Sequence, residues 1–101
     1  MSKKLQDELT DKLFDAILLL KTREECYNFF EDVGTISEIK AFAQRLEVAK
    51  MLEQGRTYRD IHEKTGASEA TISRVSRSLN YGADGYRLII ERLKGKETEG
   101  A

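Results

Sequence analysis

Apolar residues recur at spacings of three and four along most of this chain, which is the period of an α-helix with one buried face. No stretch alternates apolar and polar residues over the length of a strand, so the pattern predicts an all-α fold. It divides the chain into helices over about residues 5–20, 22–33 and 35–54, a helical hairpin over about 57–79, a last helix over about 84–94 and a polar tail over 95–101. We therefore expect residues 1–94 to form a single domain of six helices.

Two of these helices begin with the sequence of a capping box, in which a threonine and a glutamate three residues later bond each other's backbone N–H groups. The pairs are Thr22 with Glu25 and Thr35 with Glu38. The apolar stripes that follow consist of Cys26, Phe29, Phe30 and Val33 in the first helix, and of Ile39, Phe42, Ala43, Leu46, Ala49, Met51 and Leu52 in the second. We expect both stripes to be buried, with Cys26 a small hydrophobic residue in a reducing compartment.

The two N-terminal helices present more apolar surface than a short hairpin buries on itself. The clearest excess is Phe14, Leu18, Leu20, Phe29 and Phe30. Burial of a large side chain stabilises by roughly 1.5–3 kcal/mol, so this surface predicts a partner. A second copy of the chain is the partner we expect, so that residues about 4–54 and 84–94 form a dimer interface; the alternative is that the long third helix covers the surface within one chain.

The hairpin at about 57–79 has the signals of a helix-turn-helix. Thr57 and Ser68 are N-cap residues, and Gly66 supplies the positive φ that a tight turn between helices requires. In the second helix, Ile72, Val75 and Leu79 share one face, and the other face carries Glu69, Ala70, Ser73, Arg74 and Arg77. Small polar and arginine side chains outside such a helix suit insertion into the major groove of DNA. An antiparallel hairpin of an ordinary helical bundle is the alternative.

Positive charge concentrates in this hairpin, although the whole chain of 101 residues has a formal net charge of −1. Residues 55–80 have a net charge of +2, from Arg56, Arg59, Lys64, Arg74 and Arg77 against Asp60, Glu63 and Glu69. A local patch is enough to attract phosphate, so double-stranded DNA is the partner we expect.

The residue types offer little for catalysis. With one histidine, one cysteine, no paired metal-ligand spacing and no glycine-rich nucleotide loop, the sequence predicts neither an enzyme nor a metal or cofactor site. No apolar run approaches the ~18 residues that cross a bilayer, and the N-terminus lacks the apolar stretch of a signal peptide. We therefore expect a cytoplasmic protein with no membrane partner.

The stretch from Thr35 to Leu79 resembles the Trp repressor family and, more narrowly, its Trp-repressor-like YerC/YecD group. The resemblance rests on Gln44-Arg45, Leu52-Glu-Gln-Gly55, Arg59, Gly66-Ala67, Ala70-Thr-Ile-Ser-Arg74, Ser76 and Ser78-Leu79. The N-terminal third matches in pattern only. The resemblance implies an intertwined all-α homodimer that binds operator DNA, a docking mode of which the Trp repressor is itself an example, with tryptophan as corepressor in the founding branch.

The resemblance also implies an effector pocket. In the Trp repressor the corepressor lies between two arginines, whose positions are taken here by Arg45 and Arg74. Thr35, supplied by the partner subunit, and Ser78 match two further pocket residues. The residue after the second arginine is glycine in the Trp repressor, where it leaves room for indole, and here it is Val75. Because an overpacked site typically loses ~1–3 kcal/mol, we expect L-tryptophan to bind weakly or not at all, and another small molecule, or none, to act as effector.

The predicted function is that of a sequence-specific DNA-binding transcriptional regulator, a repressor, that acts as a homodimer on a two-fold operator. The residues we expect to contact DNA are Arg59, His62 and Arg77 on phosphates or groove edges, and Glu69, Ala70 and Ser73 on bases.

Three alternatives stay open. Arg45 and Arg74 could form ion pairs with Glu47 or Glu38, or contact phosphate, instead of lining a pocket. His62 could be an ordinary surface residue. The acids of the hairpin keep open a helical homodimeric protein-interaction module without specific DNA binding.

Overall fold

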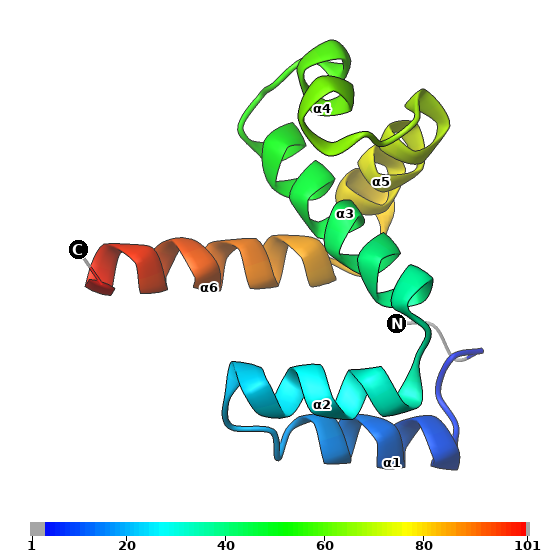
Figure 1. The fold of residues 1–101 in the computed structure, drawn as a ribbon. Helices are drawn as coiled ribbons and strands as arrows, with labels where there is room; N and C mark the ends of the chain where they lie inside the picture. Colours follow the sequence, from blue (N-terminus) through cyan, green and yellow to red (C-terminus); the bar gives the residue numbers. More distant parts are fainter. Residues whose placement is uncertain (1–3, 101) are drawn as a thin grey trace. The chain divides into compact units, whose positions relative to one another are not determined.

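Six α-helices joined by short connections make up the computed structural model of the protein, which describes residues 4–100, with side chains through residue 97 (Figure 1). The helices are α1 (Glu8–Ile17), α2 (Arg23–Val33), α3 (Ile36–Glu53), α4 (Tyr58–Thr65), α5 (Glu69–Tyr81) and α6 (Gly85–Gly100). The described residues contain no strand, so the predicted all-α fold is confirmed. The described residues divide into two compact units, which are described in turn; the boundary lies within α3, between Lys40 and Ala41.

Local side-chain bonds set where the first two helices begin. The Oδ1 atom of Asp7 accepts the backbone N–H of Thr10 at 2.7 Å, and Oγ1 of Thr22 accepts that of Glu25 at 3.1 Å. The bond from Thr10 stabilises the charged carboxylate and so lowers the pKa of Asp7. The Glu25 carboxylate reaches back to the N–H of Lys21 at 2.9 Å, one residue before the position that a capping box predicts.

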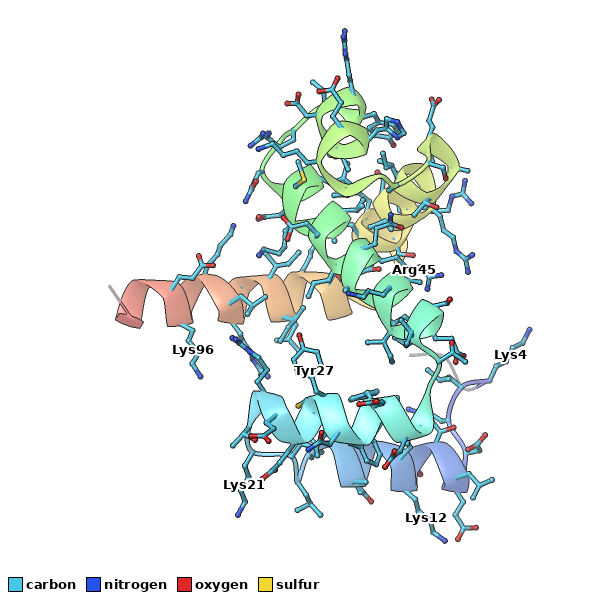
Figure 2. All side chains as sticks on the ribbon, viewed as in Figure 1. Lys4, Lys12, Lys21, Tyr27, Arg45 and Lys96 are labelled. Carbon is cyan, nitrogen blue, oxygen red and sulfur yellow. The ribbon has the colours of Figure 1, made fainter. Side chains whose placement is uncertain are left out.

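The first unit leaves much of its apolar surface uncovered. Its exposed large apolar side chains are Leu5, Leu9, Phe14, Leu18, Leu19, Tyr27, Val33 and Ile36. Figure 2 shows Tyr27 projecting from α2. The rings of Phe29 and Phe30 are half-buried and meet edge to face, with a centroid distance of 5.4 Å.

The predicted burial of Cys26 and Val33 is wrong for this chain, because both side chains are exposed. Helical spacing correctly places them on one helix, but it does not say which element covers their face.

The long helix α3 begins at a complete capping box, as predicted. The N–H of Thr35 donates to Oε1 of Glu38 at 2.8 Å, and the N–H of Glu38 donates to Oγ1 of Thr35 at 3.1 Å. The bond from Thr35 favours the charged form of the acid and lowers the pKa of Glu38.

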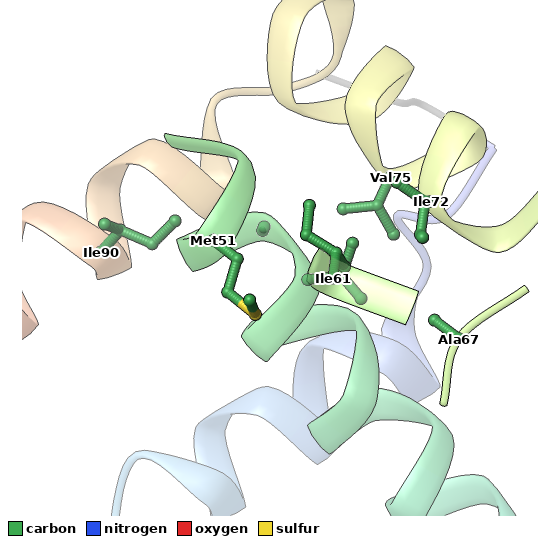
Figure 3. Packing of buried hydrophobic residues seen from close by; sticks show 8 residues of the cluster. Met51, Ile61, Ala67, Ile72, Val75 and Ile90 are labelled. Carbon is green, nitrogen blue, oxygen red and sulfur yellow. The ribbon is translucent and has the colours of Figure 1, made fainter. Parts of the chain in front are cut away.

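One hydrophobic core holds the second unit together. It consists of Val48, Ala49, Met51, Ile61, Ala67, Ile72, Val75 and Ile90, with Leu52 and Tyr86 packed against it (Figure 3). The predicted inner face of α5, Ile72 with Val75 and Leu79, is buried. In α3 the prediction omitted Val48, which is fully buried. It included Phe42 and Ala43, which are exposed because they precede the part of α3 that meets the core.

The last helix is longer than predicted. We expected it to end near residue 94 with a polar tail over 95–101, whereas α6 continues to Gly100. A single glycine such as Gly95 costs a helix interior roughly 1 kcal/mol without ending it. At the point where the tail was expected, Nζ of Lys94 lies 2.7 Å from Oε2 of Glu53, which joins α6 to the end of α3.

Candidate nucleic-acid interface

The hairpin of α4 and α5 has the local geometry predicted from its sequence. The Oγ1 atom of Thr57 accepts the N–H of Asp60 at 3.1 Å, and Oγ of Ser68 accepts that of Thr71 at 3.1 Å, so both N-caps are confirmed. Gly66 ends α4 with a φ of 76°, in the left-handed region, and its N–H donates back into the helix. These three features together are those of a helix-turn-helix.

The two faces of α5 differ in exposure as the sequence predicted. The outward positions Glu69, Ala70, Arg74 and Arg77 are exposed, and Ser73 is half-buried. Glu69 and Ala70 lie in the first turn of the helix, the part of a recognition helix that contacts base edges. The exposed face therefore combines a positive charge with small side chains that permit close approach of a duplex.

The exposed arginine of α4 pairs with an acid of its own helix. The Nε atom of Arg59 lies 3.3 Å from Oε1 of Glu63, and both side chains are exposed. A neighbouring pair, Arg56 with Asp60, has a separation of 3.5 Å. Such exposed pairs contribute at most ~1 kcal/mol, so an incoming phosphate competes with them easily.

His62 is bonded to the turn. Its Nδ1 atom lies 2.8 Å from the carbonyl oxygen of Ala67, although the histidine as a whole is exposed. A carbonyl oxygen only accepts, so Nδ1 carries the hydrogen and Nε2 is left for an outside partner. His62 thus has a structural contact that the sequence did not predict. The phosphate contact that the sequence did predict for His62 stays a prediction.

A cavity of about 190 Å³ lies beside α5, within the second unit. Its lining consists of Arg45 from α3, Thr71, Arg74, Val75 and Ser78 from α5, and Tyr86 from α6. Four of the five predicted pocket residues are therefore brought together. The sequence analysis missed Thr71, although its spacing of three from Arg74 and seven from Ser78 places it on the same face of the helix. Tyr86 could not be predicted from the sequence, because its place in the lining depends on where α6 packs.

Thr35, the fifth predicted pocket residue, is not in this lining; it caps α3. The resemblance assigns that position to the partner subunit.

Two arginines give the cavity its charge. Arg45 projects from α3 (Figure 2), and its guanidinium carbon lies 5.8 Å from the centroid of the Phe42 ring, within cation–π range. Glu47 pairs with a lysine of its own helix at 3.8 Å. The ion pairs of Arg45 and Arg74 that the sequence left open do not occur among the described residues, so both guanidinium groups are available to an anion.

Val75 is at once a wall of this cavity and a member of the core, with 2% of its surface exposed (Figure 3). Its two methyl groups occupy space that a glycine would leave open at the same position. The cavity is therefore lined by arginine and hydroxyl groups on one side and by the methyl groups of Val75 on the other.

The described part of the chain contains no group of three or more His, Cys, Asp or Glu side chains that could hold a metal ion. None of its helices combines the length and the apolar character needed to cross a bilayer.

Comparison with known proteins agrees with the geometry. Residues 8–94 match the family model described as Trp repressor protein. The chain is 57% identical over 96 residues to YerC of Bacillus subtilis (strain 168), an uncharacterised protein, covering 95% of this chain and 92% of YerC.

Two solved structures superpose closely. A TrpR-like protein from Eubacterium eligens ATCC 27750 has a TM-score of 0.89 at 61% identity, covering 92% of this chain and 96% of that one. A Trp-repressor-like protein from Staphylococcus aureus has a TM-score of 0.88 at 54% identity, covering 91% and 92%. The family resemblance and the six-helix architecture are both confirmed.

Proposed function

Because the chain belongs to the Trp repressor family, we propose that it is a sequence-specific DNA-binding transcriptional regulator. The family is one of regulators rather than enzymes. The observation that carries the proposal is the α4–α5 hairpin, in which two N-caps and a left-handed turn present an exposed face of arginine and small side chains. In this proposal Arg59, His62 and Arg77 contact phosphates or groove edges, while Glu69, Ala70 and Ser73 contact bases.

We propose that a homodimer is the form that binds. In the first unit Leu9 and Leu18 are 79% and 81% exposed, and six further large apolar side chains are exposed with them. A second copy of the chain would cover these side chains. It would also relate two recognition helices by a two-fold axis, so that they contact two half-sites about one helical turn apart.

The cavity beside α5 is our proposed effector site. Two guanidinium groups with the hydroxyls of Thr71, Ser78 and Tyr86 suit a small ligand that carries a carboxylate or another oxyanion. L-Tryptophan is not the ligand we expect, because Val75 occupies the room that an indole ring requires.

The test is selection from a random duplex pool by the purified protein without added tryptophan, followed by sequencing. Enrichment of an inverted repeat with half-sites about one helical turn apart is the expected result. Glu69→Gln should change the enriched sequence, and Lys96→Ala, which removes an exposed positive charge from α6, should leave the enriched sequence unchanged. A pool that stays random, with and without small-molecule extracts, would favour a protein-binding hairpin instead.

A further inference from the structure

Arg87 of α6 bonds to the C-terminal end of α5. Its Nε donates to the carbonyl oxygen of Leu79 at 3.1 Å, and its Nη2 donates to Oδ1 of Asn80 at 3.0 Å. The last four carbonyls of a helix have no partner within the helix. The carbonyl of Leu79 is one of these, and the guanidinium group of another helix satisfies it.

The contact continues along α5 through Asn80. The Nδ2 atom of Asn80 donates to the carbonyl oxygen of Ser76 at 3.0 Å and approaches its Oγ at 3.4 Å. Ser76 lies one turn earlier, between the core residue Val75 and the exposed Arg77. One guanidinium group is therefore connected to two successive turns of the recognition helix; we call Arg87, Asn80 and Ser76 the end clamp.

The end clamp also supplies a charge that α5 lacks. The last turn of α5 contains no basic side chain, although a positive charge there is favourable to the helix dipole. The link between the helices is tight as well, because a Cβ at Gly82 would collide with the carbonyl of Ser78. Arg87 bridges this turn from eight residues beyond Leu79.

We propose that Arg87 is a positioning residue for the recognition helix, and that the end clamp sets the sequence discrimination of the protein. This rests on the proposed DNA-binding function. The core holds α5 by its inner face, at Ile72, Val75 and Leu79, through apolar contacts that have no preferred direction, whereas hydrogen bonds do. Base contacts require placement within about 0.5 Å, and two directed bonds from a planar guanidinium supply that restraint at the end of α5.

The test compares Arg87→Ala, Arg87→Lys and Asn80→Ala with the control Lys96→Ala, which removes an exposed positive charge of α6 outside the expected dimer interface. The measurement is the ratio of affinities for the selected site and for an unrelated duplex at one salt concentration. Arg87→Ala and Asn80→Ala should each lower this ratio about tenfold, and Lys96→Ala should leave it unchanged. Arg87→Lys should keep the affinity for unrelated DNA, because its charge is retained, without restoring the ratio, because an ammonium group lacks the planar fork.

A second measurement does not depend on DNA. Amide hydrogen exchange at Tyr81 and Gly82 should be faster in Arg87→Ala and Asn80→Ala than in the wild type, with Lys96→Ala unchanged. A wild type that selects no site, with this exchange pattern intact, would refute the proposed function while supporting the clamp. Unchanged exchange, an unchanged affinity ratio, or full rescue of the ratio by lysine would each overturn the positioning role.

Discussion

The Nδ1–H of His62 donates to the carbonyl oxygen of Ala67 at 2.8 Å, across the turn that joins α4 to α5. Ala67 is 1% exposed, so its carbonyl lies at the edge of the core. Thr65 supports the same turn, since its Oγ1 donates to the carbonyl of Ile61 at 2.7 Å and accepts the N–H of Ala67 at 3.1 Å. The helix-turn-helix is thus closed by side-chain bonds as well as by its glycine.

Replacement of His62 by alanine should lower the free energy of unfolding by about 1 kcal/mol, the usual contribution of one such hydrogen bond. Urea unfolding at a fixed protein concentration measures it, because a dimer's stability depends on concentration. Lys64→Ala, an exposed change on the same helix, is the control. Equal stability of His62→Ala and the wild type would leave the histidine only its proposed phosphate contact.

The exposed face of α5 should divide into two kinds of contact. Arg77→Ala should weaken binding to every duplex and lower the slope of log affinity against log salt by about one, because one phosphate contact is lost. Glu69→Gln should instead change which base is preferred, since a carboxylate accepts from cytosine N4. Titrations of both variants against a panel of single-base operator changes test this, and identical profiles for the two would contradict the division.

The ion pair in α4 should oppose DNA binding. Glu63→Gln removes a negative charge beside the proposed phosphate contact and releases Arg59, whose Nε lies 3.3 Å from the Glu63 carboxylate. We expect the affinity for any duplex to rise by about two- to tenfold at low salt, with the gain shrinking as salt rises. Glu97→Gln, an exposed change on α6, is the matched control. An equal gain from Glu97→Gln would assign the effect to net charge alone.

Val75 should govern what the cavity beside α5 accepts. Val75→Gly should cost about 2–4 kcal/mol of stability, from lost core contacts and from a glycine inside a helix. It should also make L-tryptophan raise the melting temperature in a saturable way, with Val75→Ala intermediate. A thermal-shift titration measures both, and a large saturable shift in the wild type would show that the valine leaves room for indole.

The capping box of α3 should make stability sensitive to acid. The bond from the N–H of Thr35 lowers the pKa of Glu38 below its usual 4.5, so the folded state favours the carboxylate. Its contribution is therefore present at neutral pH and is lost as pH falls through the lowered pKa.

Glu38→Gln should consequently be less stable than the wild type at pH 7, and the difference should vanish as pH falls through the lowered pKa of Glu38. Thermal unfolding at a series of pH values from 7 downwards tests it, with Glu31→Gln, exposed on α2, as control. Because Asp7 also has a lowered pKa, both proteins should retain some acid sensitivity. A constant difference between Glu38→Gln and the wild type at all pH values would contradict the assignment.

The features predicted correctly are the local ones. The caps and the turn follow from the sequence, because Thr57, Gly66 and Ser68 each bond to residues no more than four positions away. The burial of Cys26 was predicted wrongly and that of Val48 was missed, because burial depends on which elements meet.

The candidate pocket likewise contains residues that the sequence identified and residues whose place depends on which elements meet. Arg45, Arg74, Val75 and Ser78 were identified through the family resemblance, and the structure places them around one cavity. Tyr86 and the contact of Arg87 with α5 were not predicted, because both require knowledge of where α6 returns to α5.

Gly66 shows that the requirement at a turn can be one of handedness rather than size. No atom lies within 4 Å of the place where its Cβ would be, so space does not exclude a side chain; only the φ of 76° disfavours an L-residue. A D-amino acid favours that same φ. A chemically synthesised chain with D-alanine at position 66 should therefore fold as the natural one does and be more stable by about 0.4–1 kcal/mol, because its unfolded state has less freedom to lose, whereas L-alanine there should destabilise it. The mirror image of an ordinary residue would fit this turn better than the residue that evolution had available.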